Sequence, residues 1–477
     1  MTKYLILIVV LSLFGPSSFG AHPNILFIAI DDMRDWTGYS GTPQARTPNL
    51  DRLAKSGVAF TRAYTAYALC NPSRTALLTG LRPSTTGVIN NGIDWREAVP
   101  AERPSLPGYL RANGYRTAGQ GKIFHGSKLR REDWDEFGKD NEREEKDNDR
   151  HDLSLKQGTS PDSFTIGSNA IVPVDTPEEE LVDYKTASFG VEQLGKSHEK
   201  PFFLACGFHR PHLPLAAPRK YFDMFPLSSI TLPELQSNDL SDLPKAGVQM
   251  AKAGEFAAIR DLNKWQECVR AYLACIAFTD AQVGRLLDAL DRSPNKDNTI
   301  VCLWSDHGWH HGEKEHWRKS TLWEEATRSP LIWRVPGVTK PGGVCARTVD
   351  FLGIYPTMCD VVGLPLPPHL ESVSFKSLLD DPNGAWDRPA ISTMHDGNHA
   401  VRTERWRYIR YADGGEELYD HTNDSHEWTN LADRPELASI KANLGKFLPT
   451  KPEAVSEAQT KPVKKKKKKL SRVAEEK

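Results

Sequence analysis

Two long apolar runs, each followed by a pair of polar residues, constrain the fold of this chain most strongly. Residues 24–30 read Asn-Ile-Leu-Phe-Ile-Ala-Ile and lead into Asp31-Asp32, and residues 298–305 lead into Asp306-His307. Because polar residues do not alternate with the apolar ones, each run is typical of a strand buried on both faces of a parallel sheet. Sites in open α/β sheets lie at the carboxyl ends of the strands, so these polar pairs are site candidates.

Further segments fit the same α/β plan. Residues 201–207 form a third apolar run that leads into His209, and residues 114–122 have the pattern of a strand ending at Lys122. Helical patterning falls between these strands, at residues 48–57, 102–114, 178–194 and 264–290. Short antiparallel strands are predicted after about residue 381, at residues 389–394, 400–403, 406–412 and 417–419. A hairpin turn at 413–415 and a helix at 435–447 complete this region.

The first twenty residues have the pattern of a secretory signal peptide. Lys3 precedes an apolar run of eleven residues, 4–14, and small residues at Ser18 and Gly20 precede Ala21. The run is too short for an ordinary membrane span, and no other stretch of the sequence approaches that length. We therefore expect export without a membrane span, to a secreted or periplasmic location, or to the lysosome in a eukaryote.

A length of 477 residues and a change of composition along the chain suggest several units. We expect a large domain at 21–380, an α+β subdomain at 381–449 and a tail at 450–477. The tail contains Lys464–Lys469 and almost nothing apolar, so disorder is expected there. A solvated tail is the simpler interpretation, and electrostatic docking to an acidic polysaccharide or surface is the alternative. The net charge is −1, and no nucleic-acid-binding module is visible in the sequence.

The segment from Cys70 to Gly80 reads Cys-Asn-Pro-Ser-Arg-Thr-Ala-Leu-Leu-Thr-Gly. Pro72 suits the first turn of a helix and Gly80 its end, which predicts residue 70 at a helix N-terminus, where free N–H groups favour an anion. A lone cysteine at this place is also compatible with a buried small hydrophobe. The segment matches the pattern Cys-x-Pro-Ser-Arg-x-x-Leu-x-Thr-Gly at every position, and in this the chain resembles the sulfatase family.

The resemblance implies that Cys70 is not a thiol in the mature protein. In sulfatases a formylglycine-generating enzyme oxidises this cysteine to formylglycine, whose hydrated aldehyde attacks the sulfur of a sulfate ester. The second hydroxyl of the hydrate then expels the sulfate, a route that serine or cysteine alone lacks. A divalent cation beside the diol stabilises its alkoxide and polarises the sulfate oxygens. Sulfate ester hydrolysis by the domain at 21–380 is the implied activity.

The two strand-end pairs are the metal ligands that the resemblance implies. Asp31, Asp32, Asp306 and His307 would hold the cation, together with the modified Cys70. Carboxylate-rich coordination favours Ca²⁺, with Mg²⁺ as the alternative. The family most often has Asn where His307 stands, whereas iduronate-2-sulfatase-like members have an Asp-His pair, and imidazole is a softer ligand than hard cations prefer. Capping of a following helix is the structural alternative for either Asp31 or Asp32 alone.

Basic residues near Cys70 would act on the sulfate and on the nucleophile. Arg74, four residues after Cys70 on the same helical face, would hold the diol and the oxygens on the metal side. The segment 121–125 matches the Gly-Lys-x-x-His element of the family. In this element Lys122 would neutralise sulfate charge, and His125 would stabilise the diol or accept its proton.

Two later segments supply groups for the leaving alkoxide. Residues 208–214 resemble the His-x-Pro-His segment of the family, in which we favour His209 as the sulfate-contacting acid, with His212 as the alternative. Lys319 resembles the second sulfate-binding lysine, which follows the Asp-His strand. One histidine and one lysine at the bridging oxygen would stabilise the leaving group.

The histidines that follow residue 307 have two interpretations. A zinc cluster is disfavoured because their spacing is not that of a helical metalloprotease site and because Gly308 and Gly312 interrupt any helix. We expect instead that substrate-pocket residues lie here, namely His310, His311 and Glu313. Specificity is also expected in the charged segment 128–157, interpreted as an exposed insertion, and in the C-terminal subdomain.

The resemblance extends over residues 24–432 and is strongest to iduronate-2-sulfatases, which implies a sulfated sugar or a polysaccharide such as a glycosaminoglycan as substrate. The implied fold is that of the alkaline phosphatase superfamily: α/β, with a large mixed, mostly parallel central sheet flanked by helices and a smaller C-terminal antiparallel sheet plus helix. Two alternatives remain open. One is a phosphate or phosphonate monoester hydrolase on the same scaffold, and the other is a non-catalytic carbohydrate-binding protein with unmodified Cys70.

Overall fold

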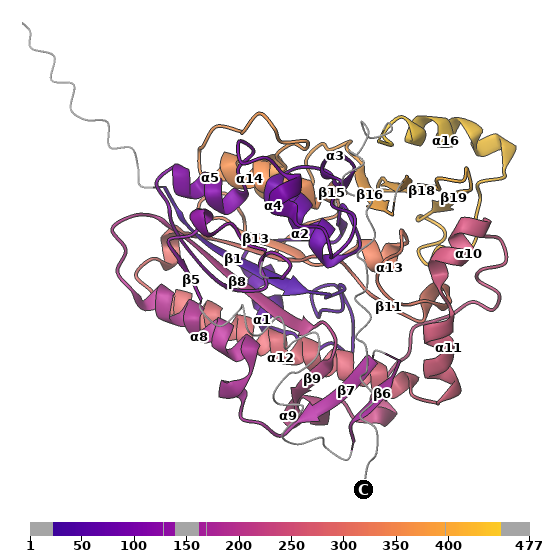
Figure 1. The fold of residues 1–477 in the computed structure, drawn as a ribbon, viewed down its shortest axis with the longest axis horizontal. Helices are drawn as coiled ribbons and strands as arrows, with labels where there is room; N and C mark the ends of the chain where they lie inside the picture. Colours follow the sequence, from indigo (N-terminus) through magenta and orange to yellow (C-terminus); the bar gives the residue numbers. More distant parts are fainter. Residues whose placement is uncertain (1–21, 127, 139–161, 168, 396, 450–477) are drawn as a thin grey trace, which may run out of the picture.

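The computed structural model describes residues 22–126, 128–138, 162–167, 169–395 and 397–449 (Figure 1). The predicted signal peptide, the tail and most of the charged segment 128–157 lie outside these residues. No helix among the described residues combines the length and the apolar character needed to cross a bilayer.

A large sheet lies at the centre of the molecule, with helices on both faces (Figure 1). Every pairing in the described part of this sheet is parallel except the two made by β13, which runs against β10 and β2. The eight described strands are, in spatial order, β14 (Gly343–Cys345), β2 (Val58–Phe60), β13 (Leu331–Arg334), β10 (Thr299–Ser305), β1 (Asn24–Asp31), β8 (Phe202–Pro211), β4 (Arg116–Gly121) and β5 (Glu136–Phe137). The prediction of a mixed, mostly parallel central sheet is therefore confirmed.

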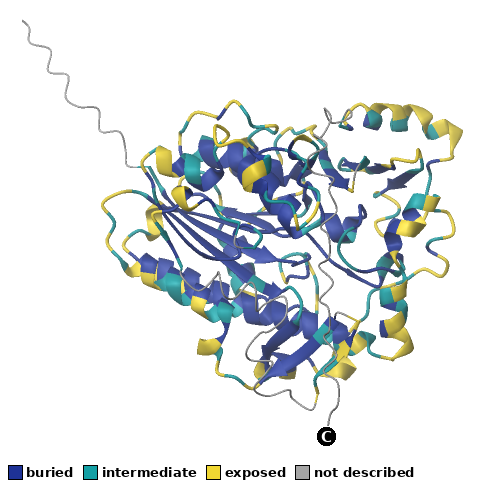
Figure 2. Ribbon diagram, viewed as in Figure 1, coloured by how far each residue is buried: buried dark blue, intermediate teal, exposed yellow. Residues whose placement is uncertain are grey.

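The central strand β1 is buried along its whole length because both faces of the sheet are covered. Alternate residues of a strand point to opposite faces. Leu26, Ile28 and Ile30 belong to one hydrophobic core, whereas Ile25 and Phe27 belong to the other. Figure 2 shows the central strands as buried, with exposed residues on the outer surfaces of the surrounding helices.

Helices cover both faces of the sheet, and the long helix α12 (Trp265–Arg292) lies on one of them (Figure 1). The helices of this first face are α1 (Pro48–Ser56), α8 (Val182–Gly195) and α12. Those of the second face include α2 (Cys70–Thr79), α5 (Leu106–Ala112) and α14 (Ile354–Val361). The predicted helix at 102–114 begins only at Leu106, because the Ser105 side chain caps it by accepting a hydrogen bond from the N–H of Gly108.

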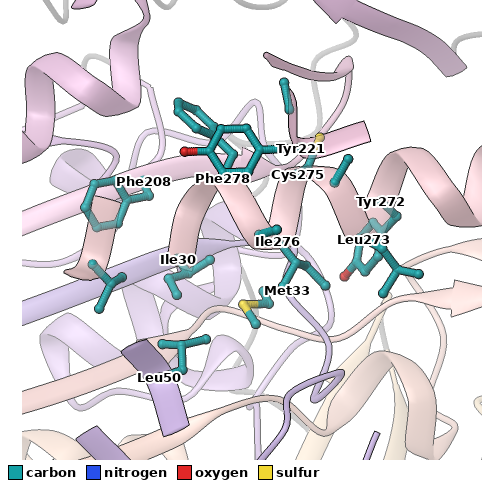
Figure 3. Close-up of a cluster of buried hydrophobic side chains, with 14 of the residues drawn as sticks. Ile30, Met33, Leu50, Phe208, Tyr221, Tyr272, Leu273, Cys275, Ile276 and Phe278 are labelled. Atoms are coloured by element: carbon teal, nitrogen blue, oxygen red, sulfur yellow. The ribbon is translucent and has the colours of Figure 1, made fainter. Parts of the chain in front are cut away.

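The core between α12 and the sheet is shown in Figure 3. Tyr272 and Ile276 of α12 belong to the same buried cluster as Ile30 and Met33, the residues on either side of the Asp31-Asp32 pair. Burial of this apolar surface fixes the end of β1 against a rigid helix. The packing therefore holds the carboxyl end of β1 in place.

The helix predicted after residue 70 is present as α2, which begins at Cys70 and ends at Thr79. Gly80 caps its C-terminus with φ of 69°, a left-handed conformation that glycine adopts without strain. A side chain at this position would also meet Leu370. Both the start and the stop of the predicted helix are confirmed.

A smaller antiparallel sheet follows in the C-terminal part, next to α10 (Lys245–Ala251) and the segment 322–326 (Figure 1). Its four described strands are β16 (Ala390–Met394), β17 (Asn398–Arg402), β18 (Trp406–Arg410) and β19 (Glu416–Asp420). The helix α16 (Ala438–Gly445) continues a 3₁₀ turn at Pro435–Leu437, so the predicted sheet plus helix is confirmed. The boundary at residues 380 and 381 stays a prediction.

A buried ion-pair network joins the small sheet to α13 (Glu324–Thr327). Arg407 on β18 is completely buried and pairs with Glu324 and with Glu427. Arg402 on β17 pairs with the same Glu324 oxygen at 3.1 Å. The network therefore links α13 to two strands of the C-terminal sheet.

Loss of the Arg407 guanidinium would leave the buried Glu427 carboxylate without its main partner and the buried Glu324 carboxylate with one cation fewer. We expect Arg407→Ala to lower the free energy of unfolding by about 3–5 kcal/mol, measured by urea denaturation. Arg405→Ala removes an exposed pair with Asp420 on the same sheet and serves as the control. Its denaturation midpoint should stay close to that of the wild type. Equal midpoints for the two variants would contradict a stabilising role of the network.

Candidate active site

The carboxyl ends of β1 and β10 meet the N-terminus of α2. The two strands are parallel and in register, with Ile30 opposite Ser305, so the residues that follow them lie side by side. The backbone N–H of Asp32 donates a hydrogen bond to the Asp306 carboxylate at 2.9 Å. Asp32 has φ of 60°, and the carbonyl of this strained residue accepts a hydrogen bond of 2.6 Å from the Tyr272 hydroxyl.

Cys70 lies inside this group of charged side chains. Its Sγ atom is 3.5 Å from Asp32 Oδ1, 3.5 Å from His307 Nε2 and 3.1 Å from Lys319 Nζ. Burial and the nearby Asp31 raise the pKa of the Cys70 thiol, but Lys122 and Lys319 outweigh them and the pKa is lowered overall.

Other buried cysteines have the opposite electrostatics. Cys206 on β8 is completely buried without a cation beside it, and burial raises its pKa to about 12. Cys275 on α12 likewise has its pKa raised to about 12 by burial. Cys70 therefore does not lie in the environment of an inert core cysteine, which disfavours the interpretation as a small hydrophobe.

Two overlapping groups of side chains around Cys70 could hold a metal ion. In each group one atom per residue lies within 4.8 Å of the others. The groups are Asp32, Cys70, Asp306 and His307, and Asp31, Asp32, Cys70 and His212. Each group offers two carboxylates and one imidazole, and the two groups together contain three carboxylates. Carboxylate oxygens suit a hard divalent cation better than a thiophilic metal, so these residues fit Ca²⁺ or Mg²⁺.

His307 is oriented for such a role. Its Nδ1 atom lies 3.0 Å from the Gly308 carbonyl, which leaves Nε2 facing Asp32 Oδ1 at 3.1 Å. Burial lowers the pKa of His307, but the carboxylates of Asp306 and Asp32 outweigh it and raise the pKa well above the ordinary value. The imidazole therefore interacts with the carboxylates that the cation would share.

Arg74 holds two of these carboxylates. Its Nε atom donates to Asp306 Oδ2 at 2.8 Å, and a terminal nitrogen donates to Asp31 Oδ1 at 3.2 Å. Arg74 lies on the same helix as Cys70, as predicted, but its guanidinium contacts the Asp31 and Asp306 carboxylates and not residue 70. Ser73, which the sequence analysis did not single out, supports the same unit by donating a hydrogen bond of 2.5 Å to the Asp306 carbonyl.

Lys122 and His125 follow β4, and Lys122 reaches the site at Asp31. Lys122 Nζ forms a buried ion pair with Asp31 Oδ2. Burial and the neighbouring Lys122 lower the pKa of His125 to about 3, so its ring is neutral at physiological pH. The Nδ1 atom of His125 has no hydrogen-bond partner among the described residues.

The structure brings His212, and not His209, to the nucleophile. His212 Nε2 lies 3.7 Å from Asp32 Oδ2 and belongs to a group that includes Cys70. His209 Nδ1 faces Asp183 of α8 at 3.6 Å, and its backbone N–H donates to the same carboxylate at 2.8 Å. This geometry favours His212, the alternative in the sequence analysis, and the role of either histidine at the sulfate stays a prediction.

Asp183 is a supporting residue that the sequence analysis missed. It is 2% exposed and accepts hydrogen bonds from the N–H groups of His209 and Arg210. It fixes the strand end from which His212 extends. No local motif marks it, since an acidic residue in the first turn of a helix is common.

The residues predicted to line the substrate pocket are instead part of the protein interior. The His311 ring stacks on Trp36 at 4.3 Å and meets the edge of Tyr272 at 4.3 Å. Both nitrogens of His310 lie within hydrogen-bond distance of protein oxygens, the Glu313 carbonyl at 3.1 Å and Thr321 Oγ1 at 2.8 Å. The Glu313 carboxylate pairs with Arg34.

These contacts correct the predicted role of His310, His311 and Glu313. His310 and Glu313 use their polar atoms to hold the loop after β10, whereas the buried His311 ring packs against aromatic rings and neither of its nitrogens has a hydrogen-bond partner among the described residues. The zinc alternative also lacks support, because His310, His311 and His316 are absent from the metal-compatible groups of the described residues.

Comparison with known proteins agrees with this geometry. Residues 23–364 match the model of the family described as Sulfatase, and residues 312–453 match that of N-sulphoglucosamine sulphohydrolase, C-terminal. The chain belongs to the sulfatase family. As a member of this family it is a sulfuric ester hydrolase.

Curated relatives span most of the chain. A protein named Sulfatase from Formosa agariphila is 38% identical over 459 residues, which cover 89% of this chain and 86% of that protein. Human iduronate 2-sulfatase is 29% identical over 468 residues, which cover 88% of this chain and 82% of the human protein. The predicted resemblance to iduronate-2-sulfatases is thus confirmed at the level of sequence similarity.

Solved structures confirm the predicted fold. A protein in complex with its substrate D-glucosamine-2-N,6-O-disulfate superposes with a TM-score of 0.71 at 22% identity, covering 90% of this chain and 97% of that chain. A phosphonate monoester hydrolase from Silicibacter pomeroyi superposes with a TM-score of 0.74 at 22% identity, covering 89% of this chain and 94% of that chain. At these identities the likeness establishes the shared fold.

Proposed function

We propose that this sulfatase hydrolyses a sulfate ester on a sulfated sugar, with residue 70 converted to formylglycine and a divalent cation beside it. One observation carries the proposal: Cys70 lies at the N-terminus of α2 in contact with Asp32, His307 and Lys319. A buried residue surrounded by both carboxylates and cations fits a nucleophile that must receive an anionic substrate.

The chain's own residues would divide the work as follows. Lys319 and His212, both partly accessible, would contact the sulfate oxygens, and Lys122 would add positive charge from the opposite side. Formylglycine would supply a geminal diol as nucleophile and internal release group, and a cation held by the carboxylates would stabilise the negative charge on the diol oxygen. Arg74 would keep Asp31 and Asp306 in place throughout.

Proton transfer needs one acceptor and one donor. The Nδ1 atom of His125 has no partner among the described residues, so the ring has a free nitrogen that can accept the proton from the diol. His212 and Lys319 suit donation to, or stabilisation of, the leaving alkoxide, since both lie on the solvent side of Cys70 with side chains 26% and 12% exposed. This assigns the sulfate-contacting histidine to residue 212.

The substrate that we propose is a 2-O-sulfated uronic sugar, as in a glycosaminoglycan. Support comes from the relative named iduronate 2-sulfatase and from the Asp306-His307 pair. We also propose that residues 21–380 form the catalytic domain and 381–449 the C-terminal subdomain. Residues 1–20 would direct export to a secreted, periplasmic or lysosomal location.

The first experiment is peptide mass spectrometry on residues 63–74, using protein co-expressed with a formylglycine-generating enzyme. We expect formylglycine at position 70 together with release of sulfate from 2-O-sulfated uronides. An unmodified thiol combined with glycan binding and no turnover would instead support the carbohydrate-binding alternative. The same preparation should be assayed with aryl sulfate and aryl phosphate esters.

The phosphate or phosphonate alternative has one observation in its favour, the shared fold with a phosphonate monoester hydrolase. Both ester classes present tetrahedral oxyanions to the same cationic groups. We expect kcat/KM to be higher for the aryl sulfate than for the matched phosphate monoester. A reversed ratio would replace the proposed reaction with phosphoryl ester hydrolysis.

Removal of the cation tests the metal part of the proposal. Dialysis against a chelator should lower turnover at least about tenfold and lower the melting temperature, because an ion that binds only the folded state stabilises it. Addition of Ca²⁺ should restore both quantities, with Mg²⁺ as the comparison and Zn²⁺ as the control. Full activity in a preparation shown to be metal-free would contradict the proposed cation site.

A further inference from the structure

The backbone around Lys319 is strained. Arg318 and Ser320, on either side of Lys319, have φ of 83° and 79°, and Lys314 has φ of 54° in the same loop. Such conformations are unfavourable for residues with a Cβ atom and persist only where the surrounding structure holds them. Contacts that hold this loop should therefore determine where Lys319 points.

His316 supplies one of these contacts. Its side chain is buried, and Nε2 lies 2.8 Å from the Lys319 carbonyl oxygen. Nδ1 contacts the carbonyl oxygen of Ala251, the last residue of α10. The ring thus bridges α10 and the backbone of Lys319. On the other side, the Ser320 N–H donates to the Ala68 carbonyl at 3.0 Å, close to the start of α2.

We propose that His316 is a positioning residue for Lys319, one that ties the Lys319 backbone to α10 and so keeps its Nζ against Cys70 and Asp32. Lys319 Nζ lies 3.1 Å from Cys70 Sγ and 2.6 Å from Asp32 Oδ1, so a displaced backbone would move the ammonium out of reach. The inference rests on the sulfate-binding role proposed above for Lys319.

The two partners of His316 are both carbonyl oxygens, which only accept hydrogen bonds. A neutral imidazole has one N–H and can serve one carbonyl, whereas the imidazolium serves both. The groups that face the ring are Glu255 on α11 (Gly254–Asp261), Lys252 after α10, and the His310 ring at 5.1 Å. Burial lowers the pKa of His316 below its ordinary value, although the two carbonyls and Glu255 act against this effect.

Two substitutions of His316 separate the effect of its hydrogen bonds from the effect of its side-chain volume. His316→Leu keeps apolar volume without a donor, and His316→Gln restores an amide NH₂ that can donate two hydrogen bonds at any pH. We expect His316→Leu to lower kcat about 10- to 100-fold with a smaller change in KM, because a misplaced catalytic group costs rate. His316→Gln should recover most of this loss. The ratio of wild-type kcat to that of His316→Gln should fall as pH rises and the wild-type ring loses its proton.

A second readout does not depend on sulfate ester turnover. Limited acetylation followed by peptide mass spectrometry should label Lys319 slowly in the wild type and in His316→Gln, and faster in His316→Leu. Lys340, which is exposed, serves as the internal reference in each sample. Equal Lys319 labelling in His316→Leu and the wild type overturns the inference, as does equal kcat loss in both variants. A wild type that labels as expected but hydrolyses no sulfate ester overturns the proposed function alone.

Discussion

Cys70→Ala is expected to abolish turnover while leaving the fold intact. The variant lacks the thiol group that oxidation to formylglycine requires, so no nucleophile can form and kcat should fall by about 10⁴-fold or more. Only Sγ is removed, and the side chain lies among polar groups at a helix N-terminus, so the melting temperature should change little. The measurement is sulfate release under saturating substrate, with thermal unfolding as the fold control.

Cys70→Ser tests whether release of the covalent sulfate requires the second hydroxyl of formylglycine. Serine can attack sulfur but has no second hydroxyl to expel the sulfate, so at most one slowly released covalent sulfate per molecule is expected. Intact-protein mass spectrometry after incubation with substrate detects such an adduct. Sustained multiple turnover by either Cys70→Ala or Cys70→Ser would contradict the assignment of residue 70 as nucleophile.

Asp306→Asn is expected to lower kcat/KM by about 10³-fold. The substitution removes a proposed metal ligand and one negative charge that pairs with Arg74. Asp306 accepts from Arg74 Nε at 2.8 Å and from the Asp32 N–H at 2.9 Å, and it belongs to a metal-compatible group around Cys70. The neutral amide keeps the shape but leaves the buried guanidinium with one fewer counter-charge. Higher Ca²⁺ should be required for the remaining activity.

A matched control for this variant is Asp280→Asn on α12. Asp280 is also a buried aspartate that accepts backbone hydrogen bonds, from Asn49 and Leu50, but it is not part of the metal-compatible groups among the described residues. We expect it to lower thermal stability without changing the Ca²⁺ requirement. An Asp306→Asn enzyme with wild-type kcat/KM and wild-type Ca²⁺ dependence would contradict the proposed role.

Local sequence patterns predicted the elements that hold the site. The run at residues 24–30 became β1 because unbroken apolar residues need cover on both faces, and the structure gives each face its own core. Cys70 begins α2 and Gly80 ends it because Pro72 and Gly80 fix local backbone angles. The strand-end pairs Asp31-Asp32 and Asp306-His307 meet because β1 and β10 are adjacent parallel strands.

The sequence predicted the directions of side chains less well than it predicted helices and strands. The choice between His209 and His212 stays a prediction, because it depends on where β8 ends, and an extension of the strand by a few residues changes which histidine faces the site. His310 and His311 were assigned to a pocket from their proximity in sequence to His307. The structure packs them among aromatic and polar partners that come from distant segments.

By itself, the sequence determined the position of Cys70 at the start of a helix, the buried strands and the acidic residues at the ends of these strands. These features follow from backbone propensity and burial pattern within short segments. Only the tertiary structure decided that Lys319 contacts Asp32 across 287 residues, that Asp183 supports the His209 segment and that His316 ties Lys319 to α10. Such contacts depend on how elements far apart in the chain pack together, and no local spacing encodes that geometry.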